Sequence, residues 1–149
     1  MKVTAKGEYA TRAVLHLAMQ HPEVVSIHQI AKRHRIPVKY LEQILLELKR
    51  GGILTSRRGV HGGYLLSRDP DEISVGEVLQ IVDSRTIDSP ALQQNFACSG
   101  DSGCALKQVW TDVRTAVEKI PFETSFADVC ANTRTDPPVA NISKLGASA

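Results

Sequence analysis

The 149-residue sequence has no long apolar run. No uncharged stretch approaches the roughly 18 to 20 apolar residues that a helix needs to cross a bilayer. The first residues, MKVTAKGEYATR, also lack the apolar segment of a secretory signal peptide. We therefore expect a cytoplasmic protein that does not enter a membrane, with enough apolar residues (42 %) to form one full hydrophobic core.

Cysteine is scarce, with three residues in the chain. An odd number cannot be fully paired within one chain, and the reducing cytoplasm disfavours permanent disulfides. Two of the three, Cys98 and Cys104, nevertheless bracket five small, turn-forming residues in the stretch CSGDSGC. This spacing points either to metal ligation or to a thiol-disulfide switch, and both readings stay open.

Histidine is absent after residue 61, and the sequence contains neither an HExxH motif nor a glycine-rich phosphate-binding loop. A cysteine nucleophile in CSGDSGC would have no histidine base from its own half of the chain. We therefore do not expect an enzyme.

Acidic residues are few in the first half of the chain and basic residues are few in the second. Residues 1–70 hold 12 Lys and Arg against 5 Asp and Glu, whereas residues 71–149 hold 6 against 11. A surplus of Lys and Arg is what a module needs to neutralise phosphates. The pattern favours a nucleic-acid-binding N-terminal half joined to an acidic C-terminal half, with chance clustering of surface charge as the alternative.

Three helices are expected in the basic half. Thr4 caps a first amphipathic helix, and Ser26 with Gln29 forms a capping box for a short second one. Pro37 stands in the first turn of a third helix, which keeps its apolar residues on one face until Gly51. The helices are close together in sequence, as in a helix-turn-helix.

A β-hairpin is expected directly after the third helix. Two β-prone runs, residues 53–57 and 64–67, flank the glycine-rich stretch RGVHGG. Three helices followed by a hairpin is the order of a winged helix-turn-helix. The expected fold is mostly α with a small β-hairpin, a winged helix-turn-helix domain plus a long C-terminal dimerisation helix.

The candidate DNA-binding residues lie on the second helix, the third helix and the hairpin. They are Ser26, His28, Lys39, Tyr40, Gln43, Arg57, Arg58 and His61. A third helix in the major groove would let Lys39 and Gln43 reach base edges, and Tyr40 a phosphate or a thymine methyl group. The wing would place Arg58 in the adjacent minor groove.

A long helix is expected over residues 106–120, ending at Pro121. Its apolar residues keep helical i, i+3, i+4 and i+7 spacing. They are Leu106, Val109, Trp110, Val113, Val117 and Ile120. Because the winged unit already has its own core, we expect this stripe to pair with a second copy and form a homodimer.

The chain is accordingly divided into four parts. Residues 1–83 form the DNA-binding domain and residues 84–104 a connection with the cysteine sensor loop. Residues 105–131 form the dimerisation helix and a short following helix, and residues 132–149 a polar, disordered tail.

Four stretches carry a family resemblance: KGEYATRAVLHLA, YLEQILLELKRGGIL, SRRGVHGGYLLSRDP and SVGEVLQIVD. In this order they resemble the IscR, NsrR and CymR family of bacterial winged-helix regulators, the Rrf2 type. The resemblance implies a homodimeric transcription regulator that binds a palindromic operator in double-stranded DNA. It also implies a specificity role for Glu42, which matches an acidic residue near the base edges.

Many members of this family hold an iron-sulfur cluster in a loop before the long helix. Their three cysteines are six residues apart, and this chain has the second and third as Cys98 and Cys104 but Leu92 in place of the first. Lys107 stands where some members have a ligating histidine. The resemblance implies an iron-sulfur cluster of the two-iron two-sulfur type, with two ligands still to be found.

Two residues could complete the ligand set. Glu8 matches a position that supplies an acidic ligand from the partner subunit in some members. Cys130 lies beyond the long helix, about 20 Å from the loop, and is better explained as a small buried residue. The alternative is a cluster-free regulator that acts by a thiol switch or through a partner protein of sulfur metabolism.

Overall fold

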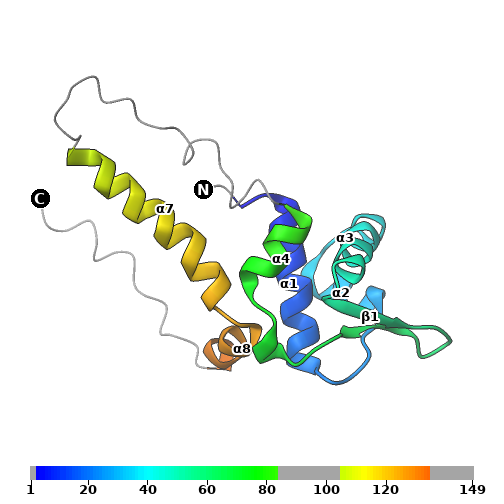
Figure 1. Ribbon diagram of the computed structural model, residues 1–149. Helices are drawn as coiled ribbons and strands as arrows, with labels where there is room; N and C mark the ends of the chain where they lie inside the picture. The colour runs from blue at the N-terminus through cyan, green and yellow to red at the C-terminus, as the bar shows by residue number, and fades with distance from the viewer. Residues whose placement is uncertain (1–2, 84–104, 135–149) are drawn as a thin grey trace, which may run out of the picture.

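The computed structural model describes residues 3–83 and 105–134 of the chain. The elements in chain order are α1 (Ala5–Gln20), α2 (Ile27–His34), α3 (Val38–Arg50), β1 (Leu54–Arg57), β2 (Gly63–Leu66), the 3-10 turn η1 (Pro70–Glu72), α4 (Val75–Val82), α7 (Ala105–Glu123) and α8 (Phe126–Arg134). Helices α1 to α4 gather into one body, and α7 projects from it with α8 at its base (Figure 1). The expected winged-helix order, mostly α with one hairpin, is confirmed.

The helix starts follow the local signals in the sequence. The Thr4 hydroxyl accepts a hydrogen bond from the Gly7 N–H at 3.1 Å, which caps α1. Ser26 and Gln29 form the expected capping box, with the Ser26 N–H donating to the Gln29 side chain at 2.9 Å. Pro37 precedes α3 as its N-cap rather than opening it as the first helical residue.

The core of the body lies between α1, α2, α3 and α4. Its buried members include Val14, Leu17, Ile30, Leu41, Ile44, Leu45, Leu48, Ile53 and Val78. The apolar face of α3 is therefore turned inward, as its spacing predicts. The opposite face of α3 is left to solvent.

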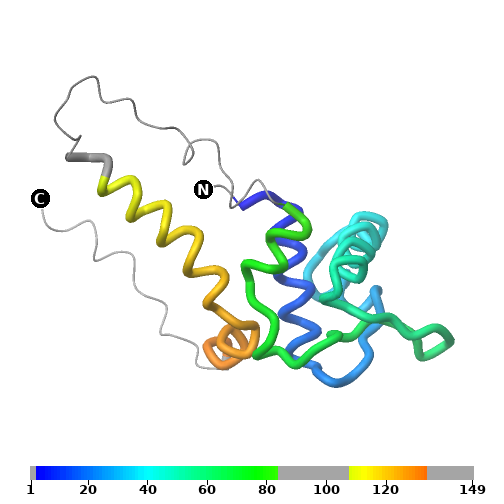
Figure 2. The backbone as a smooth tube through the Cα atoms, viewed as in Figure 1, coloured from blue at the N-terminus to red at the C-terminus, as the bar shows by residue number. Residues whose placement is uncertain are grey.

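The hairpin pairs β1 with β2 in antiparallel register, from Leu54 opposite Leu66 to Arg57 opposite Gly63. An isolated bridge joins Val25, just before α2, to Tyr64. A Cβ at Gly63 would lie 2.2 Å from the Val25 carbonyl oxygen, so only glycine allows this close approach. The hairpin is thus fixed to the body and projects on the side opposite α7 (Figure 2).

Helix α7 continues through Pro121 to Glu123, so the expectation that Pro121 ends the helix is wrong. Proline costs the helix one hydrogen bond, but the last turn of α7 is held by packing against α4. The Val75 N–H donates to the Thr124 carbonyl and the Phe126 N–H to the Ile73 carbonyl, both at 2.9 Å.

Helix α8 completes the core from the far end of the chain. Phe126 is 1 % exposed and belongs to the same buried cluster as the residues of α1 and α3. The winged unit is therefore not closed without α8, although the sequence suggested a self-contained core. Helix α8 also runs to Arg134, three residues past the boundary expected at residue 131.

Within residues 3–83 and 105–134, no helix is long and apolar enough to cross a membrane. Cys98 and Cys104, the connection over residues 84–104 and the tail beyond residue 134 lie outside the described residues.

Candidate nucleic-acid interface

The outer face of α3 carries polar and charged side chains. Lys39, Glu42 and Gln43 are all exposed, next to the buried Leu41. They lie in the first turns of the helix, the part that meets base edges in helix-turn-helix proteins. This face supplies a cation, an amide and a carboxylate, which can respectively contact guanine, adenine and cytosine in a major groove.

Tyr40 is half-buried, and its ring packs edge-on against Tyr9 of α1. The ring centroids are 5.9 Å apart and the planes meet at 79°. Tyr40 therefore helps to hold α3 against α1, and only part of its side chain is left for a ligand.

The wing presents two arginines and a histidine at its turn. Arg57, Arg58 and His61 are exposed there. Gly59 has a φ of 113°, and a Cβ at Gly62 would lie 2.5 Å from the Arg57 carbonyl oxygen. Both glycines are thus required by the tight turn that places Arg58 at the tip.

Two side-chain contacts that the sequence did not reveal position α3. The Lys49 ammonium group donates to the Ser56 hydroxyl at 2.6 Å and joins the end of α3 to the wing. Lys6 of α1 forms an ion pair with Glu47 of α3 at 2.7 Å. Lys6 and Glu47 are 41 residues apart, so no local pattern could have identified their contact.

Ser26 and His28 lie at the start of α2. The Ser26 hydroxyl accepts from the Gln29 N–H at 3.3 Å, so its first role is structural. His28 is exposed, as are Lys32, Arg33 and Arg35 further along the same segment. Lys32, Arg33 and Arg35 are suited to phosphate contacts, which position a protein on DNA without reading its sequence.

The candidate metal ligands outside the cysteine loop are separated from one another. Glu8 is paired with Arg12 on the same face of α1. Cys130 is half-buried and packs against the core from α8. Within residues 3–83 and 105–134 there is no group of three or more His, Cys, Asp or Glu side chains that could hold a metal ion.

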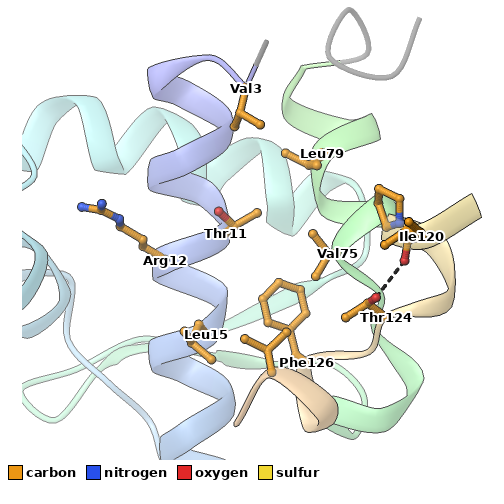
Figure 3. A pocket seen from close by; sticks show the side chains of 11 residues that line it. Val3, Thr11, Arg12, Leu15, Val75, Leu79, Ile120, Thr124 and Phe126 are labelled. Atoms are coloured by element: carbon orange, nitrogen blue, oxygen red, sulfur yellow. Dashed lines mark hydrogen bonds between the residues drawn. The ribbon is translucent and has the colours of Figure 1, made fainter. Parts of the chain in front are cut away.

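An apolar groove of about 390 Å³ lies between α1, α4, α7 and α8. Leu15, Leu79, Ile120 and Phe126 line it, and the Arg12 side chain points away from it (Figure 3). Helix α7 also carries Val109, Trp110, Val113 and Ile120, which are 40 to 63 % exposed. Their spacing in the sequence places these four side chains on one side of α7.

The sequence matches the profile of the Rrf2 family, described as an iron-dependent transcriptional regulator, over residues 3–132. A relative named HTH-type transcriptional regulator IscR, from Serratia proteamaculans, is 34 % identical over 133 residues, which cover 89 % of this chain and 80 % of that protein.

Two solved structures share the fold. The structure titled CymR, the global cysteine regulator of B. subtilis, has a TM-score of 0.75 and 26 % identity, and the match covers 89 % of this chain and 98 % of that one. The structure titled T. potens IscR has a TM-score of 0.69 and 31 % identity, covering 89 % and 88 %. The winged-helix arrangement is common to all three chains.

Proposed function

Because the chain belongs to the Rrf2 family of transcriptional regulators, we propose that it is a homodimer that binds a palindromic operator with α3 and the wing. The observation that carries this proposal is the pairing of an exposed polar face on α3 with an exposed arginine turn fixed beside it. The basic half of the chain supplies the positive field that attracts DNA.

In this proposal α3 lies in the major groove. Lys39 and Gln43 contact base edges, and Glu42 accepts from cytosine or repels phosphate, so that it limits which operators are tolerated. Arg58 enters the neighbouring minor groove from the wing. Ser26, His28, Arg57 and His61 contact the DNA backbone and hold this register, and Tyr40 contributes the exposed part of its ring.

The dimer is proposed to form through the apolar stripe of α7 and the groove beside it. The stripe exposes Val109, Trp110, Val113 and Ile120, a surface that water disfavours. A second copy carries the same stripe, so a two-fold axis can cover both at once. The two wings would then meet half-sites one helical turn, or a multiple of it, apart on the DNA.

The signal is proposed to act at the loop that holds Cys98 and Cys104. The family is described as an iron-dependent transcriptional regulator, which supports an iron-sulfur cluster in this loop, proposed to be of the two-iron two-sulfur type. Bound at two thiolates, such a cluster would make operator binding depend on iron supply and oxidants. Glu8 of the partner subunit could serve as a further ligand only after leaving Arg12.

A cluster-free regulator is the second candidate. The likeness to CymR, whose title names a cysteine regulator, supports a thiol switch or a partner protein of sulfur metabolism. Anaerobic purification with iron and sulfide counts separates the two candidates. A visible cluster absorption that is lost in Cys98→Ala and Cys104→Ala but kept in Cys130→Ala supports the cluster, and a colourless protein that binds operator DNA supports the second candidate.

The DNA proposal is tested on the operator that the wild-type protein enriches from random-sequence DNA. Arg58→Ala is expected to weaken binding to it by about 1 to 3 kcal/mol. Lys119→Ala removes an equal charge from α7, where Lys119 pairs with Glu123 at 3.6 Å, and should leave the affinity nearly unchanged. Equal losses in both variants would contradict the wing assignment.

A further inference from the structure

Two histidines meet between α1 and α2. Nε2 of His34 lies 3.3 Å from Nδ1 of His16, and the ring centroids are 5.3 Å apart with an angle of 85° between the planes. In such a contact one imidazole N–H donates to the lone pair of the other. The contact therefore exists only while at least one of the two rings is neutral.

The surroundings of the pair disfavour protonation. Burial is the main cause that lowers the pKa of His16, and the charge of Arg33 lowers it further. Burial also lowers the pKa of His34, followed by His16, Arg12 and Arg33. The facing cations are thus Arg12 from α1 and Arg33 from α2, while the buried residues of α3 are all apolar.

The position of His34 connects the pair to the DNA-binding surface. His34 is the last residue of α2, and Arg35 follows it in the left-handed conformation with a φ of 55°. The buried Ile36 and the N-cap Pro37 then lead directly into α3. A displacement at the end of α2 is therefore passed to the start of α3 within three residues.

We propose that the His16–His34 contact is a pH-sensitive latch that holds the helix-turn-helix in its DNA-binding arrangement and opens in acid. The proposal rests on the proposed function, since it concerns the same DNA-binding surface. Protonation of both rings would remove the hydrogen bond and place two cations beside Arg12 and Arg33. The end of α2 would then separate from α1 and shift the start of α3.

The direction of the pH dependence of stability follows from the lowered pKa of both histidines. The stabilising contribution is complete above the ordinary histidine pKa of about 6.5 and is lost as the pH falls through the lower pKa of the folded protein.

The test replaces the pair by amides in His16→Asn with His34→Gln, which can keep a hydrogen bond between the same positions but cannot titrate. Operator affinity and the urea midpoint of the free protein are measured at pH 7.5 and pH 5.5. In wild type we expect the urea midpoint to fall in acid and the affinity to drop about fivefold more than in the amide variant. His28→Gln, an exposed histidine on the same helix, is the control and should keep the wild-type change in urea midpoint.

Identical pH dependence of wild type and the amide variant would overturn the latch. The latch would also be overturned if the urea midpoint responded to pH in wild type alone while operator affinity changed equally with pH in both proteins. If wild type failed to bind the operator at both pH values, the proposed function would be contradicted instead. The urea midpoints of the free proteins would still test the histidine contact. If the amide variant does not fold, NMR titration of the wild-type imidazoles decides, and two independent histidines with ordinary pKa values would overturn the proposal.

Discussion

Gly76 of α4 lies directly against the ring of Phe122 in α7: a Cβ at residue 76 would be 2.6 Å from Cγ of Phe122. No real Cβ tolerates this separation, so the contact requires glycine. It sets how closely the last turn of α7 approaches the winged body. The geometry of the DNA-binding half relative to the apolar stripe therefore depends on a single missing methyl group.

Gly76→Ala is expected to destabilise the protein. Overpacking costs about 1 to 3 kcal/mol, against about 1 kcal/mol that alanine gains in helix propensity. Urea unfolding at fixed protein concentration measures the net loss. In combination with Phe122→Ala the loss should be smaller than the sum of the two single changes, and simple additivity would show that the ring does not block residue 76.

Ser26 combines a structural and a proposed DNA-binding role, and two substitutions separate them. Ser26→Ala removes the cap of α2 and should cost about 1 kcal/mol of stability. Ser26→Asp keeps a capping oxygen but adds a negative charge, so it should fold as wild type and bind the operator more weakly. If Ser26→Asp bound the operator as tightly as wild type, Ser26 would have only its capping role and no DNA contact.

Local signals in the sequence predicted much of this fold. The caps at Thr4 and Ser26 and the glycine-rich wing depend on residues a few positions apart, and all are found. The contacts between distant residues were not predicted. Lys6 with Glu47 and His16 with His34 join different helices, and only the packing of those helices brings them together.

The end of α7 illustrates the same limit. Proline normally ends a helix pattern, and nothing local to Pro121 indicates otherwise. The helix persists because Phe122 meets Gly76 and Phe126 enters the core, contacts whose gain outweighs one lost hydrogen bond. The exposed positions of the candidate interface could be inferred from periodicity, but whether Tyr40 faces solvent could not, since its packing partner Tyr9 lies on another helix.

Glu77 is expected to make stability depend on acidic pH. Burial alone would raise its pKa, but the Ser74 N–H at 2.8 Å and the Arg68 guanidinium outweigh burial and hold the pKa of Glu77 below its usual value. The folded state therefore gains stability above about pH 4.3 and loses it as the pH falls toward the lowered pKa. Glu77→Gln keeps the capping geometry without the charge, so its urea midpoint should fall less than that of wild type between pH 6 and pH 3.5. An equal fall in both proteins would rule out this contribution.

Val113→Glu is expected to separate the proposed dimer. The side chain is 40 % exposed in one chain and lies in the middle of the apolar stripe. Loss of its burial, worth about 1.5 kcal/mol or more, should raise the dimer dissociation constant at least about tenfold in sedimentation equilibrium. Thr115→Glu adds the same charge on the opposite face of α7 and serves as the control. A dimer unaffected by Val113→Glu would place the interface elsewhere.

In the proposed complex, α3 reads a palindromic DNA sequence. The most direct measurement is selection from random-sequence DNA with wild type and with Gln43→Ala in parallel. We expect wild type to enrich an inverted repeat, and Gln43→Ala to relax the base preference at one position in each half-site, symmetrically about the centre. Enrichment of no motif by wild type, or of an identical motif by both proteins, would contradict it.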